Sequence, residues 1–407
     1  MAVAIPVATA LPDRRRVLAV AGTTHALHDG YTDLIYVLLP VWQNEFGLGF
    51  AALGLLRALY TGAMAGLQIP ASMLARRFGA VTVLALGTLL AAVAYMAVGL
   101  TGAGFVMLAA MLLLGGAGSA TQHPLASALV SRSHDDGISA RTALGTYNFA
   151  GDLGKMIVPA TLAWLLAFLS WRHALGLIGL AGVAMAAAIV LLLPAGLGGA
   201  PVQGSSLGKA PAQPQAAAPA EAARPTGFLL LLVIGVIDSA TRMGFLAFLP
   251  FVLTRQGAAT ETIGLAMSLV FAGGAAGKYI CGLLGARIGV LATVLLTEGG
   301  TALGILILHG LPLSGSLAIL PLIGLALNGT SSVLYGSVPE LVPSAQRETA
   351  FGIFYTGTIG SGALAPILYG FVGDATGPDT AIVIVALVCL LTIPMAAVLN
   401  PFLRRGR

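Results

Sequence analysis

The chain has 407 residues, of which 57% are hydrophobic and only 9% are charged, and its mean hydropathy is +0.95. A water-soluble core of this size does not need so apolar a composition, so these values exclude an ordinary soluble domain and indicate that lipid surrounds most side chains. The formal net charge is +5 at pH 7.

Twelve apolar segments, each long enough to cross a bilayer, fill the chain. A hydrocarbon core about 30 Å thick needs about 20 helical residues per crossing, and backbone polar groups inside it must be satisfied within the segment. The sequence therefore predicts an all-α membrane protein with twelve transmembrane helices, because the segments are too uniformly apolar for the strands of a membrane barrel. The expected spans are 17–43, 50–75, 79–101, 104–131, 140–168, 172–194, 227–255, 260–286, 288–309, 313–341, 346–373 and 378–400.

The twenty Lys and Arg residues are distributed unevenly between the two sides of these spans. If the N-terminus is inside, fourteen lie in cytoplasmic segments, only Arg172 and Arg255 lie outside, and the other four lie within spans. Cytoplasmic loops of membrane proteins are enriched in Lys and Arg, so both termini are predicted to be cytoplasmic. The same bias explains the positive net charge without any nucleic-acid partner.

The second six spans repeat the first six at an offset of about 210 residues. The matching pairs are Pro40 and Pro250, 74–79 and 284–289, and, displaced by 207, 141–159 and 348–366. Halves with the same topology imply a two-fold axis along the membrane normal, with a site between them. We expect six-helix bundles at 1–194 and 227–407, joined by a flexible cytoplasmic linker at 195–226 that is rich in Ala, Pro, Gly, Ser and Gln.

Twelve spans, a six-plus-six repeat and a long central loop together resemble the major facilitator superfamily of transporters. The basic segment Ser72-Met73-Leu74-Ala75-Arg76-Arg77-Phe78-Gly79 is similar to the signature that follows the second helix in that family. Ser72 and Arg76 stand where the signature has Gly and an acidic residue, so we expect a contact other than the family's salt bridge to hold the inner gate.

Three further stretches lie within the spans. They are Thr24-His25-Ala26-Leu27-His28-Asp29-Gly30-Tyr31 followed by Leu38-Leu39-Pro40, Gly116-Ala117-Gly118-Ser119-Ala120-Thr121-Gln122-His123-Pro124, and Gly151-Asp152-Leu153-Gly154 leading to Pro159. Together they resemble the fosmidomycin-resistance exporters of the superfamily. The third is also a loose form of the Gly and Pro pattern of its antiporters, with Val158 in place of a Gly. The resemblance implies export from a monomeric, multi-pass protein of the bacterial cytoplasmic (inner) membrane.

Ionisable side chains inside the spans are expected to carry the chemistry, because each costs about 2.5–3.5 kcal/mol at mid-bilayer unless a cavity or a partner receives it. Polar residues of the first span recur every three or four positions and form one stripe. The first half has three intramembrane acids and two bases, so one carboxylate lacks a fixed partner and is free to take a proton. A static network that locks helix packing is the alternative. The proton-coupling candidates are Asp29, Asp33, Asp152, His25, His28 and His123.

Intramembrane cations could instead bind an anionic substrate, since ammonium and guanidinium groups pair with carboxylate or phosphonate. Lys155 is favoured, because it lies on the helix that carries the family resemblance. Arg57 has Asp33 as a plausible partner, and Arg242 and Lys278 are expected to pair with Asp238 and Glu298. Aromatic residues either line the cavity or pack the helices. The substrate-binding candidates are Arg57, Lys155, Asn148, Tyr36, Tyr147, Gln122, Asp238, Arg242 and Tyr355.

We therefore expect a secondary transporter that works by alternating access, a proton-coupled antiporter exporting a small anionic or amphiphilic toxic compound. The alternative is a proton-linked importer of an organic anion or metabolite. An enzyme is disfavoured, because no cluster has the spacing of metal ligands or of a nucleophile with its base. Neither Cys281 nor Cys389 indicates a disulfide or a metal site, so we expect no cofactor and no metal; the expected partners are the substrate, protons and the lipid bilayer.

Overall fold

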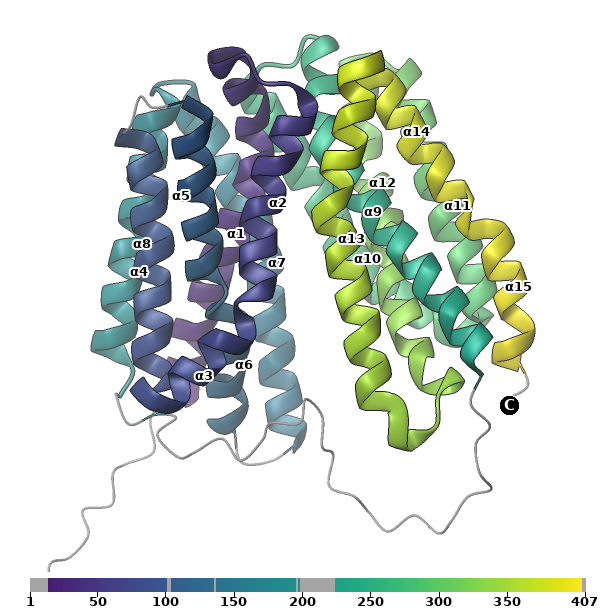
Figure 1. Ribbon diagram of the computed structural model, residues 1–407, viewed down its shortest axis with the longest axis horizontal. Helices are drawn as coiled ribbons and strands as arrows, with labels where there is room; N and C mark the ends of the chain where they lie inside the picture. The colour runs from purple at the N-terminus through teal and green to yellow at the C-terminus, as the bar shows by residue number, and fades with distance from the viewer. Residues whose placement is uncertain (1–13, 101–103, 135–136, 195–196, 198–223, 405–407) are drawn as a thin grey trace, which may run out of the picture.

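The computed structural model describes residues 14–100, 104–134, 137–194, 197 and 224–404. Within these ranges the chain forms helices and no strands, and Figure 1 shows them as two bundles side by side, one from each half of the sequence. The expected all-α fold with two six-helix bundles is confirmed. The linker expected at 195–226 lies outside the described residues, apart from 197 and 224–226.

The helices follow the expected spans closely. The first half contains α1 (Arg14–Phe46), α2 (Phe50–Gly66), α3 (Gln68–Phe78), α4 (Ala80–Leu100), α5 (Gly104–Ser119), α6 (Gln122–Arg132), α7 (Gly137–Leu166) and α8 (Trp171–Leu192). The second half contains α9 (Pro225–Arg255), α10 (Thr260–Ile288), α11 (Val290–Gly310), α12 (Leu313–Leu341), the 3-10 turn η1 (Ser344–Gln346), α13 (Arg347–Thr376), α14 (Pro378–Leu390) and α15 (Thr392–Arg404).

Three expected spans are each broken into two helices, α2 with α3, α5 with α6, and α14 with α15. In each case the second helix has a proline at its third position, Pro70, Pro124 or Pro394. A proline cannot bond to the carbonyl four residues earlier and its ring collides with that carbonyl, so the helix is interrupted just before it. The break at Leu67 bends the second span by 45°.

Ten described segments are long and apolar enough to cross a membrane, and the bent pair α2 and α3 makes eleven. α1 is not among them, although it has 33 residues, because histidines and aspartates interrupt its apolar sequence. The predicted count of twelve is therefore reached only if this polar helix also crosses the bilayer, shielded from lipid by its neighbours.

The duplication is also visible in the backbone. Gly47 and Gly257, which follow α1 and α9, have φ angles of 62° and 88°. Gly79 and Gly289, which precede α4 and α11, have φ angles of 88° and 83°. Both pairs are 210 residues apart, and this left-handed region favours glycine. The same turns therefore join equivalent helices in the two halves.

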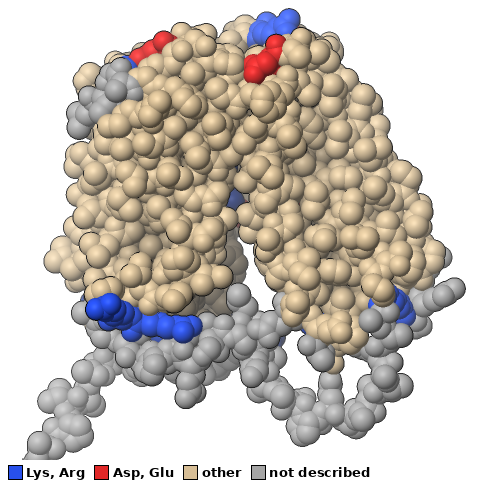
Figure 2. Space-filling model, in the orientation of Figure 1, with Lys and Arg blue, Asp and Glu red and all other residues tan. Residues whose placement is uncertain are grey.

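Figure 2 shows a hollow between the two halves that is narrow at mid-height and widens towards one end of the molecule. We call this end, where α1 begins and α15 finishes, the open end, and the opposite end, where α1 meets α2, the closed end. Arg76 and Arg77 lie in the last turn of α3 at the open end, and Arg287 lies in the last turn of α10.

At the closed end α2 packs against α13 of the other half. The contact runs through the backbone, because a Cβ at Gly54 would lie 2.3 Å from the carbonyl oxygen of Pro366, and one at Gly370 would lie 2.5 Å from the Cα of Ala51. Only glycine permits so close an approach. The two halves therefore touch there without room for side chains.

The carboxylate of Asp374, in α13, also caps the first turn of α2. It accepts hydrogen bonds from the backbone N–H groups of Phe50 at 2.5 Å and Ala51 at 3.1 Å. These donors have no partner within their own helix, and a negative charge at a helix N-terminus is favourable. Nearby, hydrogen bonds from Arg172 and Trp171 join α8 to Glu45 of α1, and the Arg172 bond holds the pKa of the Glu45 carboxyl below its usual value.

The α2–α13 contact makes a direct test possible. We expect Gly54→Ala to lower the free energy of unfolding by about 1–3 kcal/mol, because its methyl group must push the two backbones apart. Thermal unfolding in detergent measures the change. Gly62→Ala is the matched control on the same helix, since nothing lies within 4 Å of its Cβ position. Equal stability of the two variants would contradict the close contact.

Candidate functional site

α7 packs along α1 beside Asp29, and glycines bring these two helices together. A Cβ at Gly154 would lie 1.9 Å from the carbonyl oxygen of Ala26, and one at Gly30 would lie 2.3 Å from a methyl carbon of Val158. Such close backbone approach is the usual role of small residues between membrane helices. Gly154, which belongs to the stretch that resembles the antiporter pattern, therefore lets α7 pack directly against the backbone of α1.

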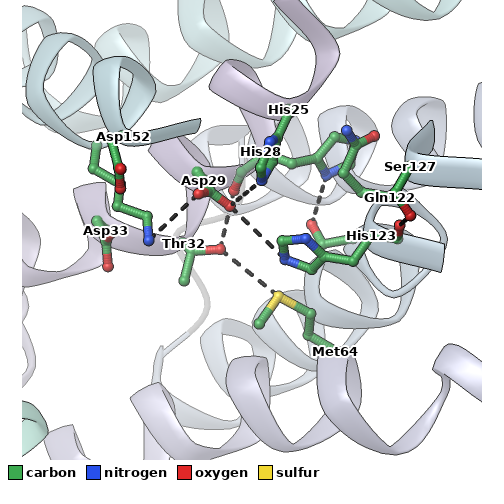
Figure 3. A network of polar contacts seen from close by, with 12 residues as sticks. His25, His28, Asp29, Thr32, Asp33, Met64, Gln122, His123, Ser127 and Asp152 are labelled. Carbon is green, nitrogen blue, oxygen red and sulfur yellow. Dashed lines mark hydrogen bonds and ion pairs between the residues drawn. The ribbon is translucent and has the colours of Figure 1, made fainter. Parts of the chain in front are cut away.

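Asp29 is the centre of the polar network in Figure 3. One carboxylate oxygen, Oδ2, lies 3.4 Å from the ammonium nitrogen of Lys155 on α7. The other, Oδ1, lies 3.4 Å from Nε2 of His25 and 3.8 Å from Nε2 of His123 on α6. Asp29 is only 8% exposed, so three partners from three helices surround a buried charge.

Two further candidates support His25. Its Nδ1 lies 2.9 Å from the backbone carbonyl oxygen of Tyr147, and the two rings stack with their centroids 4.2 Å apart. The Tyr147 hydroxyl accepts a 3.4 Å hydrogen bond from the side-chain amide of Gln122, which is fully buried. In this conformation Tyr147 and Gln122 hold the imidazole in place from behind.

His25, Asp29 and His123 also form a group of ligand types that metal ions use. One ligand atom from each residue can be chosen so that all three lie within 4.8 Å of one another. The statement that no cluster has metal-ligand spacing is therefore wrong for these residues. His25 and Asp29 are four apart on one helix, but the third ligand comes from α6, and nothing in the linear sequence indicates that it reaches them.

Asp152 forms an ion pair with the opposite half of the protein. Its Oδ1 lies 2.5 Å from the ammonium nitrogen of Lys278 on α10. The expected pairing of Lys278 with Glu298 is wrong, because the Glu298 carboxylate instead accepts a hydrogen bond from the Cys389 thiol at 3.0 Å. Lys278 is thus the base that the first half lacks: three acids, Asp29, Asp33 and Asp152, face three cations, Lys155, Arg57 and Lys278.

His28, another proton-coupling candidate, lies in a chain of hydrogen bonds. Thr88 donates its hydroxyl to the carbonyl of Leu84, so it accepts the 3.0 Å bond from His28 Nε2. On the other side, Ser119 lies 2.9 Å from Nδ1 and 2.8 Å from the Tyr60 hydroxyl. One assignment satisfies every group: Tyr60 donates to Ser119, and Ser119 donates to a neutral imidazole. These contacts join α1 to α2, α4 and α5.

Arg57 and Asp33 form the expected pair, with 3.5 Å between Nη2 and Oδ1. The guanidinium also lies over the ring of Tyr36, 4.7 Å from its centroid. The Tyr36 hydroxyl donates to the sulfur of Met243 across the halves at 3.3 Å. Arg57 is 3% exposed and Tyr36 is fully buried, so in this conformation neither reaches the surface of the hollow.

Of the remaining substrate-binding candidates, Arg242, Asn148 and Tyr355 are more accessible than Arg57, whereas Asp238 is equally buried at 3% exposed. Arg242 pairs with Asp238 at 3.6 Å, as expected, and its guanidinium also donates to Ser331 at 3.4 Å. Asn148 is exposed and lies one helical turn before Asp152 on α7, and Tyr355 is half exposed on α13. Asp374 and Lys278 are positions whose partners sequence reasoning missed because those partners belong to the other half.

The family model of the Major Facilitator Superfamily matches residues 21–251 and again residues 231–405. Two solved structures of a bacterial homologue of the human lysosomal transporter Spinster have the same fold. The inward-facing, occupied form has a TM-score of 0.79 and the inward-facing, unoccupied form 0.76; each is 17% identical and covers 97% of this chain and 98% of that chain. No curated protein is significantly similar to the chain.

The Arg57–Asp33 pair can be tested through stability. We expect Asp33→Asn to lower the free energy of unfolding by about 3–5 kcal/mol, because it leaves a buried guanidinium without its carboxylate. Thermal unfolding measures the loss, and the double variant Asp33→Asn with Arg57→Leu should recover most of it. If both variants were as stable as the wild type while substrate binding was lost, Arg57 would be a binding residue rather than a packing residue.

Proposed function

The chain belongs to the major facilitator superfamily, and on that premise we propose that it is a proton-coupled antiporter that exports a small anionic or amphiphilic compound by alternating access. We place it, as a monomer, in the bacterial cytoplasmic membrane with the open end inside, since the basic residues of α3 and α10 lie at that end. The hollow would then face the cytoplasm.

The observation that carries this proposal is the Asp152–Lys278 ion pair. α7 and α10 pack along one line of contact, where Ala163 crowds Gly264 and the Ser268 hydroxyl donates to the Met156 carbonyl at 2.6 Å. The ion pair is the next contact along this line, towards the open end. We propose that the rocking of the halves that opens the closed end draws α7 away from α10 along this line, including the ion pair. That separation would leave Asp152, whose side chain is only 16% exposed, without its cation, which carries a free-energy cost inside the membrane.

A proton on Asp152 removes this cost, because a neutral carboxylic acid can leave Lys278 without leaving an anion behind. Asp29 is a poorer candidate. Its partners, His25, His123 and Lys155, all belong to its own half and move with it when the halves rock. Only a group whose partner lies in the other half gains or loses that partner during the transport cycle. We therefore assign the coupling proton to Asp152.

An anionic substrate can break the same ion pair by binding to Lys278. The Lys278 side chain is 44% exposed and that of Lys155 is 29% exposed, so both can meet a carboxylate or phosphonate in the hollow. An anion that takes Lys278 frees Asp152 from its partner. The empty carrier would then stay locked, whereas a proton or a substrate would unlock it, which is the requirement for exchange. The export direction rests on the resemblance to fosmidomycin-resistance exporters.

The same electrostatics also favour a second candidate, a proton-linked importer of an organic anion. Protonation of Asp152 leaves Lys278 unpaired, so the hollow becomes more positive and binds an anion more tightly. Proton and anion would then travel together. The two candidates differ in the direction of proton flow relative to substrate flow. In export by antiport, protons and substrate cross the membrane in opposite directions, whereas in import by symport they cross in the same direction.

Transport into proteoliposomes with an imposed pH gradient tests the proposal, with phosphonates, organic anions and lipophilic drugs as trial substrates. We expect the wild type to accumulate its substrate against a gradient only when protons flow the opposite way. Asp152→Asn should abolish this accumulation while leaving exchange of labelled for unlabelled substrate within about tenfold of wild type, because its amide mimics the protonated acid.

Asp379→Asn is the matched control, since Asp379 pairs with Arg255 at the closed end and lies outside the hollow. It should retain full coupling. If the wild type instead accumulates substrate when protons flow in the same direction as the substrate, the result would contradict the exporter proposal and support the importer. Unchanged coupling in Asp152→Asn would refute the assigned role of this carboxylate.

A further inference from the structure

Beyond proton-coupled transport, we propose that His25, Asp29 and His123 form a binding site for one divalent transition-metal ion of the Zn²⁺, Co²⁺ and Ni²⁺ class. The two imidazoles and the carboxylate would supply three ligands, and the fourth position would face the hollow. None of the transport steps argued above needs a metal, so the site is a separate property of the same network.

The spacing of the three ligand atoms fits such an ion. Two ligands of a tetrahedral metal, each about 2.0–2.1 Å from it, lie about 3.4 Å apart. Asp29 Oδ1 lies 3.4 Å from His25 Nε2 and 3.8 Å from His123 Nε2. All three ligand atoms fall within 4.8 Å of one another. A metal ion therefore requires the ligand atoms to approach one another by about 1.4 Å at most.

The hydrogen-bond geometry of His25 also favours a cation at this place. Because a carbonyl oxygen can only accept, Nδ1 must donate its hydrogen in the 2.9 Å bond to Tyr147. In a neutral imidazole the lone pair then lies on Nε2, which is buried, faces a carboxylate oxygen and makes no well-formed hydrogen bond to any described residue. Two electron-rich atoms facing each other repel, and a cation between them removes the repulsion. A hydrogen bond from the far nitrogen to a carbonyl is also how proteins orient metal-binding histidines.

Lys155 does not occupy the same place. It approaches Oδ2 of Asp29 at 3.4 Å, whereas both histidines approach Oδ1. The ammonium group and a metal ion can therefore use different oxygens of one carboxylate. The His123 side chain is 40% exposed, so an ion can enter from the hollow and keep a water molecule as its fourth ligand.

The ligand set selects the class of metal. Imidazole suits zinc, nickel, copper and iron, whereas Mg²⁺ and Ca²⁺ prefer shells made of oxygen atoms. Two nitrogen donors and a single carboxylate therefore favour a transition metal. Because the ligands come from α1 and α6, a bound ion would also tie these two helices together beside Lys155.

Titration of the purified, tag-free protein in detergent with Co²⁺ tests this proposal, because bound Co²⁺ absorbs visible light according to its ligands. We expect one saturable site per chain, displaced by Zn²⁺ and not by Mg²⁺. His123→Gln should weaken binding by about tenfold or more, and His25→Gln and Asp29→Asn should do the same. His123 is the principal variant because its partial exposure makes misfolding improbable, and thermal unfolding checks that it is folded.

His173→Gln is the matched control, since this exposed histidine of α8 hydrogen-bonds to Ser170 at the start of its own helix. It should bind Co²⁺ as the wild type does. Absence of saturable binding to the wild type, or equal affinity in folded His123→Gln, would overturn the proposal. The measurement needs no pH gradient and no substrate, so its failure would leave the proposed transport function untouched, and the reverse also holds.

Discussion

Pairing of charges inside the membrane is the constraint on which the rest of the structure depends. Lipid cannot solvate Asp29, Asp33 or Asp152, so each carboxylate must find a cation among the neighbouring helices. Two find one within the first half, in Lys155 and Arg57. The third finds Lys278 in the second half. A contact that satisfies a charge inside the membrane thereby also joins the two halves.

Glycine and proline prepare the helices for these contacts. Gly30 and Gly154 let α1 and α7 approach closely enough for their polar stripes to meet, and Gly54 lets α2 press on α13. Proline acts by interruption: Pro124 separates α6 from α5, so that His123 stands at the start of a new helix beside α1. Glycine thus permits the backbone contacts at the closed end, and glycine and proline together position the helices that carry the charged network at mid-height.

Much of this arrangement could be predicted from the sequence, because it follows from local rules. Hydropathy located the spans within a few residues, the three-to-four spacing located the stripe of α1, and the pairs Arg57–Asp33 and Arg242–Asp238 followed from helix geometry. Pro70 and Pro394 are present in the sequence, but the segments around them are apolar throughout. Hydropathy therefore predicted one continuous span where the structure has two helices. Contacts between distant helices could not be predicted. Lys278 was matched to an acid of its own half because charges were counted half by half, and the metal-like grouping of His123 with His25 depends on how α6 meets α1.

The proposed transport cycle depends on control of the docking of the two halves by Asp152. The most direct test is the distance between spin labels at the open end, placed at Arg77 on α3 and Arg287 on α10, with the buried Cys281 and Cys389 replaced by Ala. We expect the long distance of the open hollow to dominate at high pH, and a shorter distance to gain population as the pH falls. Asp152→Asn should show both distances at every pH. A wild-type pH response in that variant would contradict the central claim.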